Sequence, residues 1–473
     1  MSKYAKNLLT VDAIYSEQKI NKHKGNPLIE ALPVFEESKD IYDLLNNPIP
    51  FQSDERKENA LIRRRCLTQL PQFFKPLGIH MDMAEFIINT IYHGYENRNP
   101  LNRDYVRKLN ALAKCAKESA SDYSKFIGTN AEAGGGCIIG LTSMGKTSCA
   151  NRVCSGIPQK IIHEKYMNKD IPRMQITWMK IDCPFDGTVK GLCENFLERF
   201  DEITGENTIK DYRHTKDIAT HFMMIKMAVI ACRHSLGVLI IDEFQNLSQA
   251  KSGGKEMMMN YILNLVNTIG VPVILMGVGE AIDNISDNLM YAKRTMGFEG
   301  MGEISNLQFN SPDWDRLIKE LWKYQWTKTE TPLTPELSSA VYMASAGIIY
   351  YVVKIFGLAQ RKIITDDPNQ NEILTVGLIE MAYFSKEFTI ERVLIEKKIH
   401  NEEIQINVLK KRKEPKSDNR ENNKNNKNNN RIKKEQLTED NLPGIIPRTD
   451  FDYYSKIAEY IENNMEGGLH NQA

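Results

Sequence analysis

The sequence predicts an α/β protein whose core is a parallel, doubly wound sheet, and three observations carry this prediction. Residues Gly140 to Thr147 read Gly-Leu-Thr-Ser-Met-Gly-Lys-Thr, the spacing of a phosphate-binding loop, directly after the apolar run from Cys137 to Ile139. A second apolar run, Leu236 to Ile241, ends in the carboxylates Asp242 and Glu243. Strand-like and helix-like stretches alternate around these two motifs, as is typical of parallel sheets.

Each position of the glycine loop has a chemical reason for its residue type. Gly140 and Gly145 let consecutive backbone N–H groups turn toward an anion, and the start of the following helix adds partial positive charge. Lys146 is expected to reach the β- and γ-phosphates of ATP, and the Thr147 hydroxyl to ligate Mg²⁺. The other residues predicted to line the nucleotide are Thr142, Ser143, Met144 and Ser148.

The two carboxylates after the second apolar run complete a predicted Mg-ATP site. Asp242 is expected to hold Mg²⁺ through water, and Glu243 to accept a proton from the water that attacks the γ-phosphate. A strand that ends in a solvated acidic turn would look the same, but the glycine loop upstream favours the Mg-ATP site. The sequence therefore predicts an ATPase that uses ATP and Mg²⁺.

Composition limits the class of protein. The 473 residues balance 61 basic against 61 acidic side chains, so any nucleic-acid binding must come from local basic patches. No apolar stretch approaches the length that spans a bilayer, and the first residues lack the apolar core of a signal peptide. The eight cysteines include no Cys-x-x-Cys pair. We therefore expect a cytoplasmic protein with reduced thiols and no membrane partner.

Residues 1–125 are expected to form an N-terminal extension that precedes the core. The apolar peptide Asn26 to Pro33 lies between prolines and is expected to dock as an extended arm. Met81 to Tyr95 and Arg103 to Lys117 have helical periodicity. The basic residues of the second helix either follow a phosphate backbone or form its solvated face; they are Arg107, Lys108, Lys114 and Lys117.

Residues 126–305 are expected to form the ATPase core. A strand that precedes the Asp-Glu pair in the chain, together with that pair, indicates the branch of phosphate-loop ATPases with a catalytic glutamate next to the metal-binding aspartate. The predicted strands after the glycine loop are Met174 to Asp182, the run ending at Asp242, and Val271 to Met276. The predicted helices are Thr188 to Thr204, Lys216 to His234 and Glu256 to Thr268.

Beyond the core, residues 306–395 contain only helical patterns, and a small helical lid after an α/β ATPase core is the layout of AAA+ proteins. Residues 396–440 are rich in Lys, Asn, Glu and Arg without apolar periodicity, so we expect a disordered linker. Residues 441–473 regain aromatic content and are predicted to be a tethered peptide that binds a partner protein, with a frayed terminal helix as the alternative.

Several short motifs in a fixed order resemble TnsC, the AAA+ regulator of heteromeric cut-and-paste transposons, with TniB and MuB as more distant relatives. The resemblance extends from Asn26 to about Lys386. Besides the phosphate loop, the resemblance depends on six short motifs. These are Asn26-Pro-Leu-Ile-Glu-Ala-Leu-Pro33, Pro76-Leu-Gly-Ile-His80, Gly94-Tyr-Glu-Asn-Arg-Asn-Pro100, Met179-Lys-Ile-Asp-Cys183, Leu239-Ile-Ile-Asp-Glu-Phe-Gln-Asn-Leu247 and Ile269-Gly-Val-Pro-Val273.

The resemblance implies a DNA-binding ATPase that forms a homo-oligomer, a ring or helical filament, on double-stranded DNA without reading its sequence. Such proteins link a target selector of the TnsD or TniQ type to transposase subunits of the TnsA and TnsB types, and hydrolysis controls the assembly. The resemblance implies that residues 1–125 contact the target selector or DNA and that residues 441–473 bind the transposase. In the cell, the cytoplasmic protein would then associate with the nucleoid. Two other functions stay open: a replication-type loader that remodels a protein ring, and a scaffold that binds ATP with little turnover.

The sequence departs from the family pattern at two places, the sensor and the lid arginine. Gly277-Val278-Gly279 offers no side chain to sense the γ-phosphate, so backbone amides do so or sensing is weak. The lid arginine is missing, and Lys354 is the nearest cation that could bind nucleotide. Arg294 resembles the family's basic pair after the sensor strand and is the candidate arginine finger for a neighbouring subunit; the alternatives are a surface arginine and a role for the adjacent Lys293. Two glycine-containing loops are DNA candidates, Asp182 to Lys190 and Lys251 to Lys255.

Overall fold

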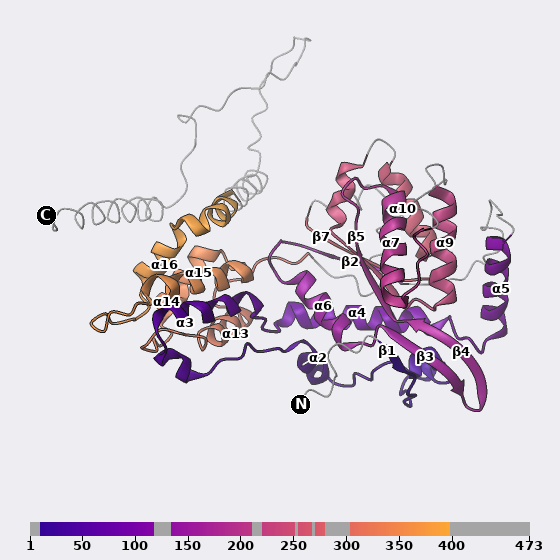
Figure 1. Ribbon diagram of the computed structural model, residues 1–473, viewed down its shortest axis with the longest axis horizontal. Helices are drawn as coiled ribbons and strands as arrows, with labels where there is room; N and C mark the ends of the chain where they lie inside the picture. Colours follow the sequence, from indigo (N-terminus) through magenta and orange to yellow (C-terminus); the bar gives the residue numbers. More distant parts are fainter. Residues whose placement is uncertain are drawn as a thin grey trace, which may run out of the picture. The chain divides into compact units, whose positions relative to one another are not determined.

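The computed structural model describes residues 10–117, 134–210, 220–250, 254–266, 270–279 and 303–397, and all of these belong to one compact unit. Its centre is a four-stranded sheet in the order β2-β7-β6-β5, in which every pair is parallel (Figure 1). The strands are β2 (Gly136–Ile139), β7 (Val273–Gly277), β6 (Val238–Asp242) and β5 (Trp178–Asp182). The α/β parallel sheet predicted from the sequence is confirmed.

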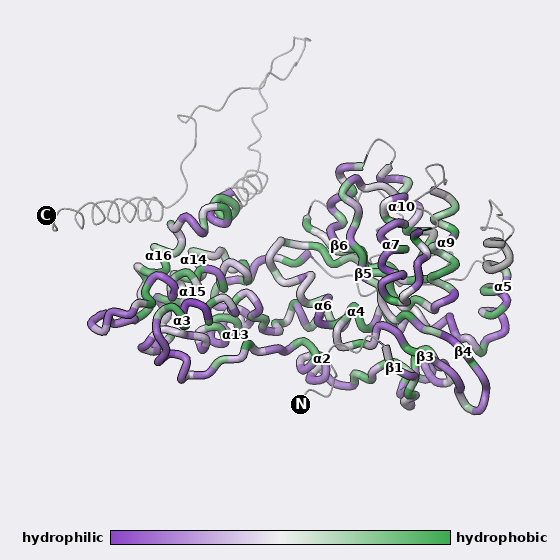
Figure 2. The backbone as a smooth tube through the Cα atoms, viewed as in Figure 1, coloured by the Kyte–Doolittle hydropathy of each residue, from purple (hydrophilic) through white to green (hydrophobic). Residues whose placement is uncertain are grey.

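Apolar side chains alternate between the two faces of this sheet, which produces two separate cores. Ile240 belongs to the core shared with α4 and α6, whereas Leu239 and Ile241 belong to the core shared with α7, α9 and α10. β6 is apolar except for its last residue, and Figure 2 colours the tube mainly hydrophobic there. The helices are α4 (Gly78–Glu96), α6 (Lys146–Gly156), α7 (Val189–Thr204), α9 (Thr220–Arg233) and α10 (Gly254–Asn264).

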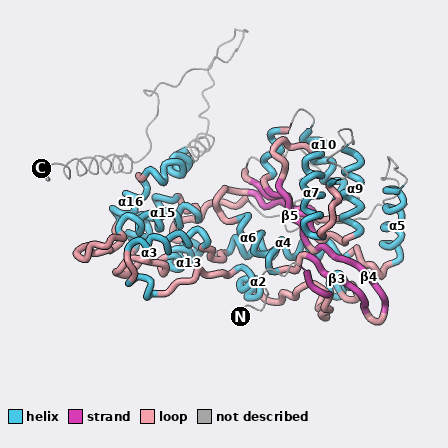
Figure 3. The backbone as a smooth tube through the Cα atoms, in the orientation of Figure 1, coloured by secondary structure: helices cyan, strands magenta, loops and turns pink. Residues whose placement is uncertain are grey.

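A second, smaller sheet was not predicted from the sequence. It consists of β1 (Thr10–Asp12), β3 (Lys160–Tyr166) and β4 (Lys169–Ile176), with β3 and β4 forming an antiparallel hairpin (Figure 3). The single strand predicted from Met174 to Asp182 is therefore wrong. The chain leaves β4 after Ile176 and enters the central sheet at Trp178, so one extended stretch serves two sheets.

The N-terminal extension is folded onto the core. Asn26 caps α1 (Pro27–Glu30) through a bond from the Leu28 N–H to its Oδ1, and its Nδ2 donates to the Tyr95 carbonyl at 2.8 Å. The peptide from Asn26 to Pro33 is thus a buried helical turn and not the predicted extended arm. The other helices of the extension are α2 (Ser38–Leu45), α3 (Ala60–Cys66) and α5 (Arg103–Lys117), with 3-10 turns η1 (Asn21–His23), η2 (Ser53–Lys57) and η3 (Leu67–Gln72).

The motif from Gly94 to Pro100 holds the segment that leads into β6. The buried Arg98 guanidinium donates to the carbonyls of Leu236 at 2.5 Å and Gly237 at 3.1 Å. The Tyr95 hydroxyl donates to the Ser235 carbonyl at 2.8 Å. Since charged and phenolic donors satisfy carbonyls that would otherwise be buried without partners, this motif fixes where β6 begins.

The described residues after 303 form a helical bundle with 3-10 turn η7 (Lys386–Phe388); its helices are α13 (Pro312–Leu321), α14 (Pro335–Ser345), α15 (Ile349–Ile363) and α16 (Val376–Tyr383). Among the described residues, we find no individual helix whose length and hydropathy would allow it to span a bilayer. By length and composition alone, α14 and α15 would pass that test as a pair, bent by 118°. The predicted linker and terminal peptide, 396–440 and 441–473, lie outside the described residues except for 396–397.

Candidate active site

The glycine loop joins β2 to α6 at the carboxyl end of the sheet. Gly145 adopts a φ of +85° and forms the N-cap of α6, and Ser143 also has a positive φ of 66°. Gly140 lies so close to the backbone of Ile304 that an added Cβ would stand 2.2 Å from the Ile304 oxygen. Only glycine fits at that position, because backbone atoms cannot move aside as a flexible side chain can.

Lys146 is the first residue of α6 and its side chain folds back over the loop. Its Nζ donates to the carbonyls of Gly140 at 2.8 Å and Leu141 at 2.6 Å. Burial lowers the pKa of Lys146 to about 8, although the charges of Asp242 and Glu243 act in the opposite direction. A cation held by neutral carbonyls in a partly desolvated loop gains from an anion, so the loop is prepared for phosphate.

The residues predicted to hold Mg²⁺ come together. Thr147 Oγ1 donates to Asp242 Oδ2 at 3.1 Å, and the Asp242 side chain is buried while Thr147 is exposed. A hydroxyl and a carboxylate are hard oxygen ligands, which suit Mg²⁺. The described residues contain no cluster of three or more His, Cys, Asp or Glu for a metal ion. This donor set fits Mg²⁺, which keeps several waters and takes its other ligands from substrate phosphates.

A lysine that the sequence analysis did not assign to the site shares the same carboxylate. Lys180 Nζ, from the neighbouring strand β5, lies 2.9 Å from Asp242 Oδ2. Lys180 and Asp242 thus form a largely buried ion pair inside the predicted metal site. The signal in the sequence was a lysine between the apolar residues Met179 and Ile181.

Glu243 follows directly after β6 and is exposed. Its φ of 55° is left-handed, which turns the chain into the 3-10 helix η5 (Phe244–Gln249). Its carboxylate accepts a hydrogen bond from Gln245 Nε2, and Gln245 Oε1 accepts one from the Val278 N–H at 3.3 Å. The end of β7, where no side-chain donor was expected, is therefore linked to Glu243 through Gln245.

The N-terminal extension and the helical bundle both support the loop. His80 Nε2, on α4, lies 3.0 Å from the Met144 carbonyl. The Tyr350 N–H, near the start of α15, donates to the Ser143 carbonyl at 3.2 Å. Of the remaining predicted contacts in the loop, Met144 is buried, whereas Thr142 and Ser148 are exposed.

Two further predicted site residues stand apart from this cluster. Lys354, on α15, pairs with Glu391 at 2.5 Å, so contact with a nucleotide would require this pair to open. Arg294 lies outside the described residues, as do Lys293 and most of the Lys251 to Lys255 loop. In the other DNA candidate loop, Lys190 lies 4.0 Å from Glu194.

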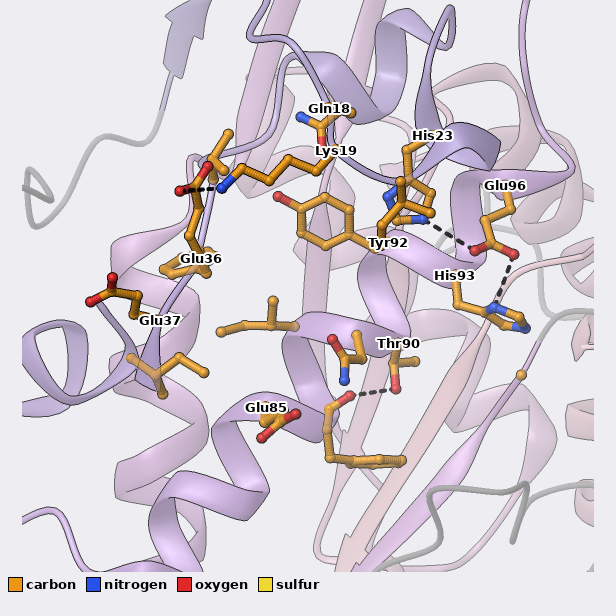
Figure 4. A pocket seen from close by; sticks show the side chains of 18 of the residues that line it. Gln18, Lys19, His23, Glu36, Glu37, Glu85, Thr90, Tyr92, His93 and Glu96 are labelled. Atoms are coloured by element: carbon orange, nitrogen blue, oxygen red, sulfur yellow. Dashed lines mark hydrogen bonds and ion pairs between the residues drawn. The ribbon is translucent and has the colours of Figure 1, made fainter. Parts of the chain in front are cut away.

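A cavity of about 750 Å³ lies elsewhere, between the N-terminal extension, α4 and the glycines that precede β2 (Figure 4). Its lining includes Glu96, whose carboxylate lies 3.1 Å from both His23 Nε2 and His93 Nδ1. Gly135 borders this cavity, while the phosphate loop follows the opposite end of β2. The cavity is therefore not the nucleotide site.

Comparison with protein families matches residues 129–285 to a model described as an AAA domain. Among solved structures, a Walker-type ATPase of Pyrococcus abyssi is similar, with 14% identity, 64% of this chain and 77% of that chain covered, and a TM-score of 0.34. Comparison with curated proteins gives no match. Within residues 129–285, the chain contains an AAA-type P-loop ATPase domain, built on a parallel α/β sheet.

Proposed function

We propose that this protein hydrolyses ATP to ADP and phosphate at the site formed by Lys146, Thr147, Asp242 and Glu243. The observation that carries the proposal is the 3.1 Å contact between Thr147 and Asp242, with Glu243 as the next residue. Two motifs 95 residues apart in the chain thereby meet at one edge of the sheet. Ligands bind at this edge, beyond the carboxyl ends of parallel strands.

The chemistry follows from the groups present. Glu243 accepts a proton from water while the water oxygen bonds to the γ-phosphorus, and the bond from that phosphorus to the β–γ bridging oxygen breaks. Lys146 and the loop N–H groups neutralise charge on the phosphates. Mg²⁺, held by Thr147 and Asp242, would supply additional charge neutralisation on the phosphate oxygens.

The test is phosphate release by the full chain with Mg-ATP, measured with and without duplex DNA. Lys146→Ala should abolish nucleotide binding, whereas Glu243→Gln should keep binding and lower kcat by roughly 100-fold or more. Full turnover by the Glu243→Gln variant would contradict the assignment of the base. Tight ATP binding without phosphate release in any condition would favour the scaffold function.

We further infer that the ATPase assembles as a homo-oligomer on double-stranded DNA and links a TnsD- or TniQ-type target selector to a TnsA- and TnsB-type transposase. The support is the order of short motifs shared with TnsC, including the peptide from Asn26 to Pro33.

The rival function is a loader that remodels a protein ring. Comparing phosphate release with and without duplex DNA distinguishes this loader from the assembling adaptor. An assembling adaptor should release phosphate at a rate that depends on duplex DNA, because subunit contacts form along it. A loader should respond to its ring and be indifferent to bare duplex. Equal rates with and without DNA, together with discrete particles on DNA in electron micrographs, would contradict the adaptor function.

A further inference from the structure

Gln245 has two contacts that join the ends of two neighbouring strands. Its Nε2 donates to the carboxylate of Glu243, which follows β6. Its Oε1 accepts from the N–H of Val278, which follows β7. β6 and β7 are adjacent in the central sheet, so Gln245 spans the edge at which the nucleotide site lies.

The two contacts require one orientation of the amide. A backbone N–H can only donate, so Val278 must face the oxygen of Gln245, and an ionised carboxylate can only accept, so Glu243 must face the nitrogen. An amide is the side-chain group that offers an acceptor and a donor side by side at this size. Glutamate at 245 could accept from Val278 but would repel Glu243, and a hydrocarbon could do neither.

The local backbone explains why Glu243 needs such a partner. The left-handed turn at Glu243 places its side chain in solvent, where a glutamate has many rotamers of similar energy. Phe244 and Leu247 are buried and anchor η5 to the core, so Gln245 is presented from a fixed element. A base must lie within hydrogen-bond reach of the water that it deprotonates, so restricting its rotamers raises the reactive fraction.

We propose that Gln245 is a positioning residue that holds the Glu243 carboxylate in place and links it to the backbone at Val278. Gly277, Val278 and Gly279 carry no polar side chain, and Gln245 provides the polar connection at this strand end. The inference rests on the proposed ATP hydrolysis and deepens it. Gln245 acts on turnover through Glu243 and leaves nucleotide binding to the phosphate loop.

The experiment compares Gln245→Ala and Gln245→Glu with Gln249→Ala as a matched control. Gln249 lies on the same 3-10 helix, and its amide contacts Ser248 Oγ at 3.3 Å, away from Glu243. We expect Gln245→Ala to lower kcat by roughly 10- to 100-fold with KM and nucleotide affinity within about twofold. Gln245→Glu should lower kcat further, because it places a second carboxylate beside Glu243. Gln249→Ala should have the kcat of wild type.

A double-mutant cycle tests whether Gln245 acts through Glu243. In the Glu243→Gln background, adding Gln245→Ala should lower kcat by less than about twofold, since the group that it positions is already gone. An equal loss in both backgrounds would overturn the inference, as would an unchanged kcat in the single variant. If Gln245→Ala lowers nucleotide affinity as well, Gln245→Met, which preserves side-chain length, replaces it in the cycle.

Hydrogen exchange separates this inference from the proposed function. Failure of wild type to release phosphate would refute ATP hydrolysis but not the contact itself. In that case, hydrogen exchange at the Val278 amide tests the contact with Gln245. Exchange should be faster in Gln245→Ala than in wild type and unchanged in Gln249→Ala. Identical exchange in all three proteins would refute the contact.

Discussion

Lys180 places a positive charge at the point where Mg²⁺ is expected. Its Nζ and the Thr147 hydroxyl share one oxygen of Asp242, so the lysine neutralises a buried carboxylate while the metal is absent. A buried charge without a partner is costly, and Lys180 removes that cost. The same contact means that Lys180 and Mg²⁺ compete for the Asp242 carboxylate.

Replacing Lys180 by Met should therefore increase the apparent Mg²⁺ affinity of the nucleotide complex. We expect the Mg²⁺ concentration for half-maximal binding of a fluorescent ATP analogue to fall several-fold, since the electrostatic competition disappears. Lys190→Met, at a surface lysine paired with Glu194, serves as the control. A requirement for more Mg²⁺ in Lys180→Met would mean that the lysine orients Asp242 for the metal instead of competing with it.

Residues within one motif could be identified from the sequence, whereas partners from other elements could not. Lys146 and Thr147 were predicted because glycine-loop chemistry depends on spacing along the chain. Lys180 contacts Asp242 on the neighbouring strand, and Gln245 contacts the backbone of Val278; nothing in the sequence around Lys180 or Gln245 specifies these distant partners. Arg294 stays a prediction because it lies outside the described residues.

At the scale of elements, α4 acts as a support for the phosphate loop. The Leu77 N–H donates to His80 Nδ1 at 3.2 Å, so the ring proton is on Nε2, which donates to the Met144 carbonyl. Phe74 packs against the imidazole with ring centroids 4.7 Å apart. Neutral His80 thus fixes the carbonyl next to Gly145 from a helix outside the predicted core.

His80→Ala should weaken binding of an ATP analogue and lower the free energy of unfolding by roughly 2–3 kcal/mol, through a lost buried hydrogen bond and a cavity. His80→Gln, which retains a hydrogen-bond donor, should show smaller losses of affinity and of stability. His93→Ala, at an exposed site on α4, should change neither property measurably; loss of affinity there would contradict the specific role of His80.

Stability should also depend on pH through this residue. Burial lowers the pKa of His80 below its ordinary value of 6.5. The contribution of His80 to stability is therefore present above pH 6.5, and it is lost as the pH falls because the unfolded chain binds the proton more readily.

The elements of the central sheet followed from apolar runs and helical periodicity, but the β3–β4 hairpin did not. Its turn is formed by Met167 and Asn168, with φ of 44° and 62°. Left-handed pairs of this kind are usually marked by glycine, and here no glycine is present. Figure 2 colours the tip of this hairpin hydrophilic, so the expected signal of a buried strand is weak as well.

At the scale of the whole molecule, one buried ion pair joins the N-terminal extension to the helical bundle. Arg63, on α3, contacts both oxygens of Glu372, and both side chains are fully buried. Arg63 also donates to the Trp326 and Thr365 carbonyls at 3.1 and 3.0 Å. The extension and the bundle are therefore one packed unit at this point.

Arg63→Ala should destabilise the protein by roughly 3–5 kcal/mol in urea unfolding, because it leaves Glu372 buried without its cation. The double variant Arg63→Leu/Glu372→Leu should recover much of this loss of stability. Arg65→Ala, exposed on the same helix, is the control; an equal loss there would refute the role of the buried pair.

The same pair makes stability depend on pH. Burial raises the pKa of Glu372, but hydrogen bonds from Arg63 and nearby backbone N–H groups lower this pKa overall. The contribution of Glu372 to stability is therefore lost as the pH falls below about 4.5.

The backbone contacts around the phosphate loop have an evolutionary consequence. Ile304 bonds through its N–H to the Ile139 carbonyl at 2.8 Å and through its carbonyl to the Leu141 N–H at 2.9 Å, and Tyr350 uses only its N–H toward Ser143. Any amino acid except proline can make such bonds. A different side chain at position 350 should therefore leave the loop in place. At position 140, in contrast, any residue other than glycine would clash with the backbone of Ile304.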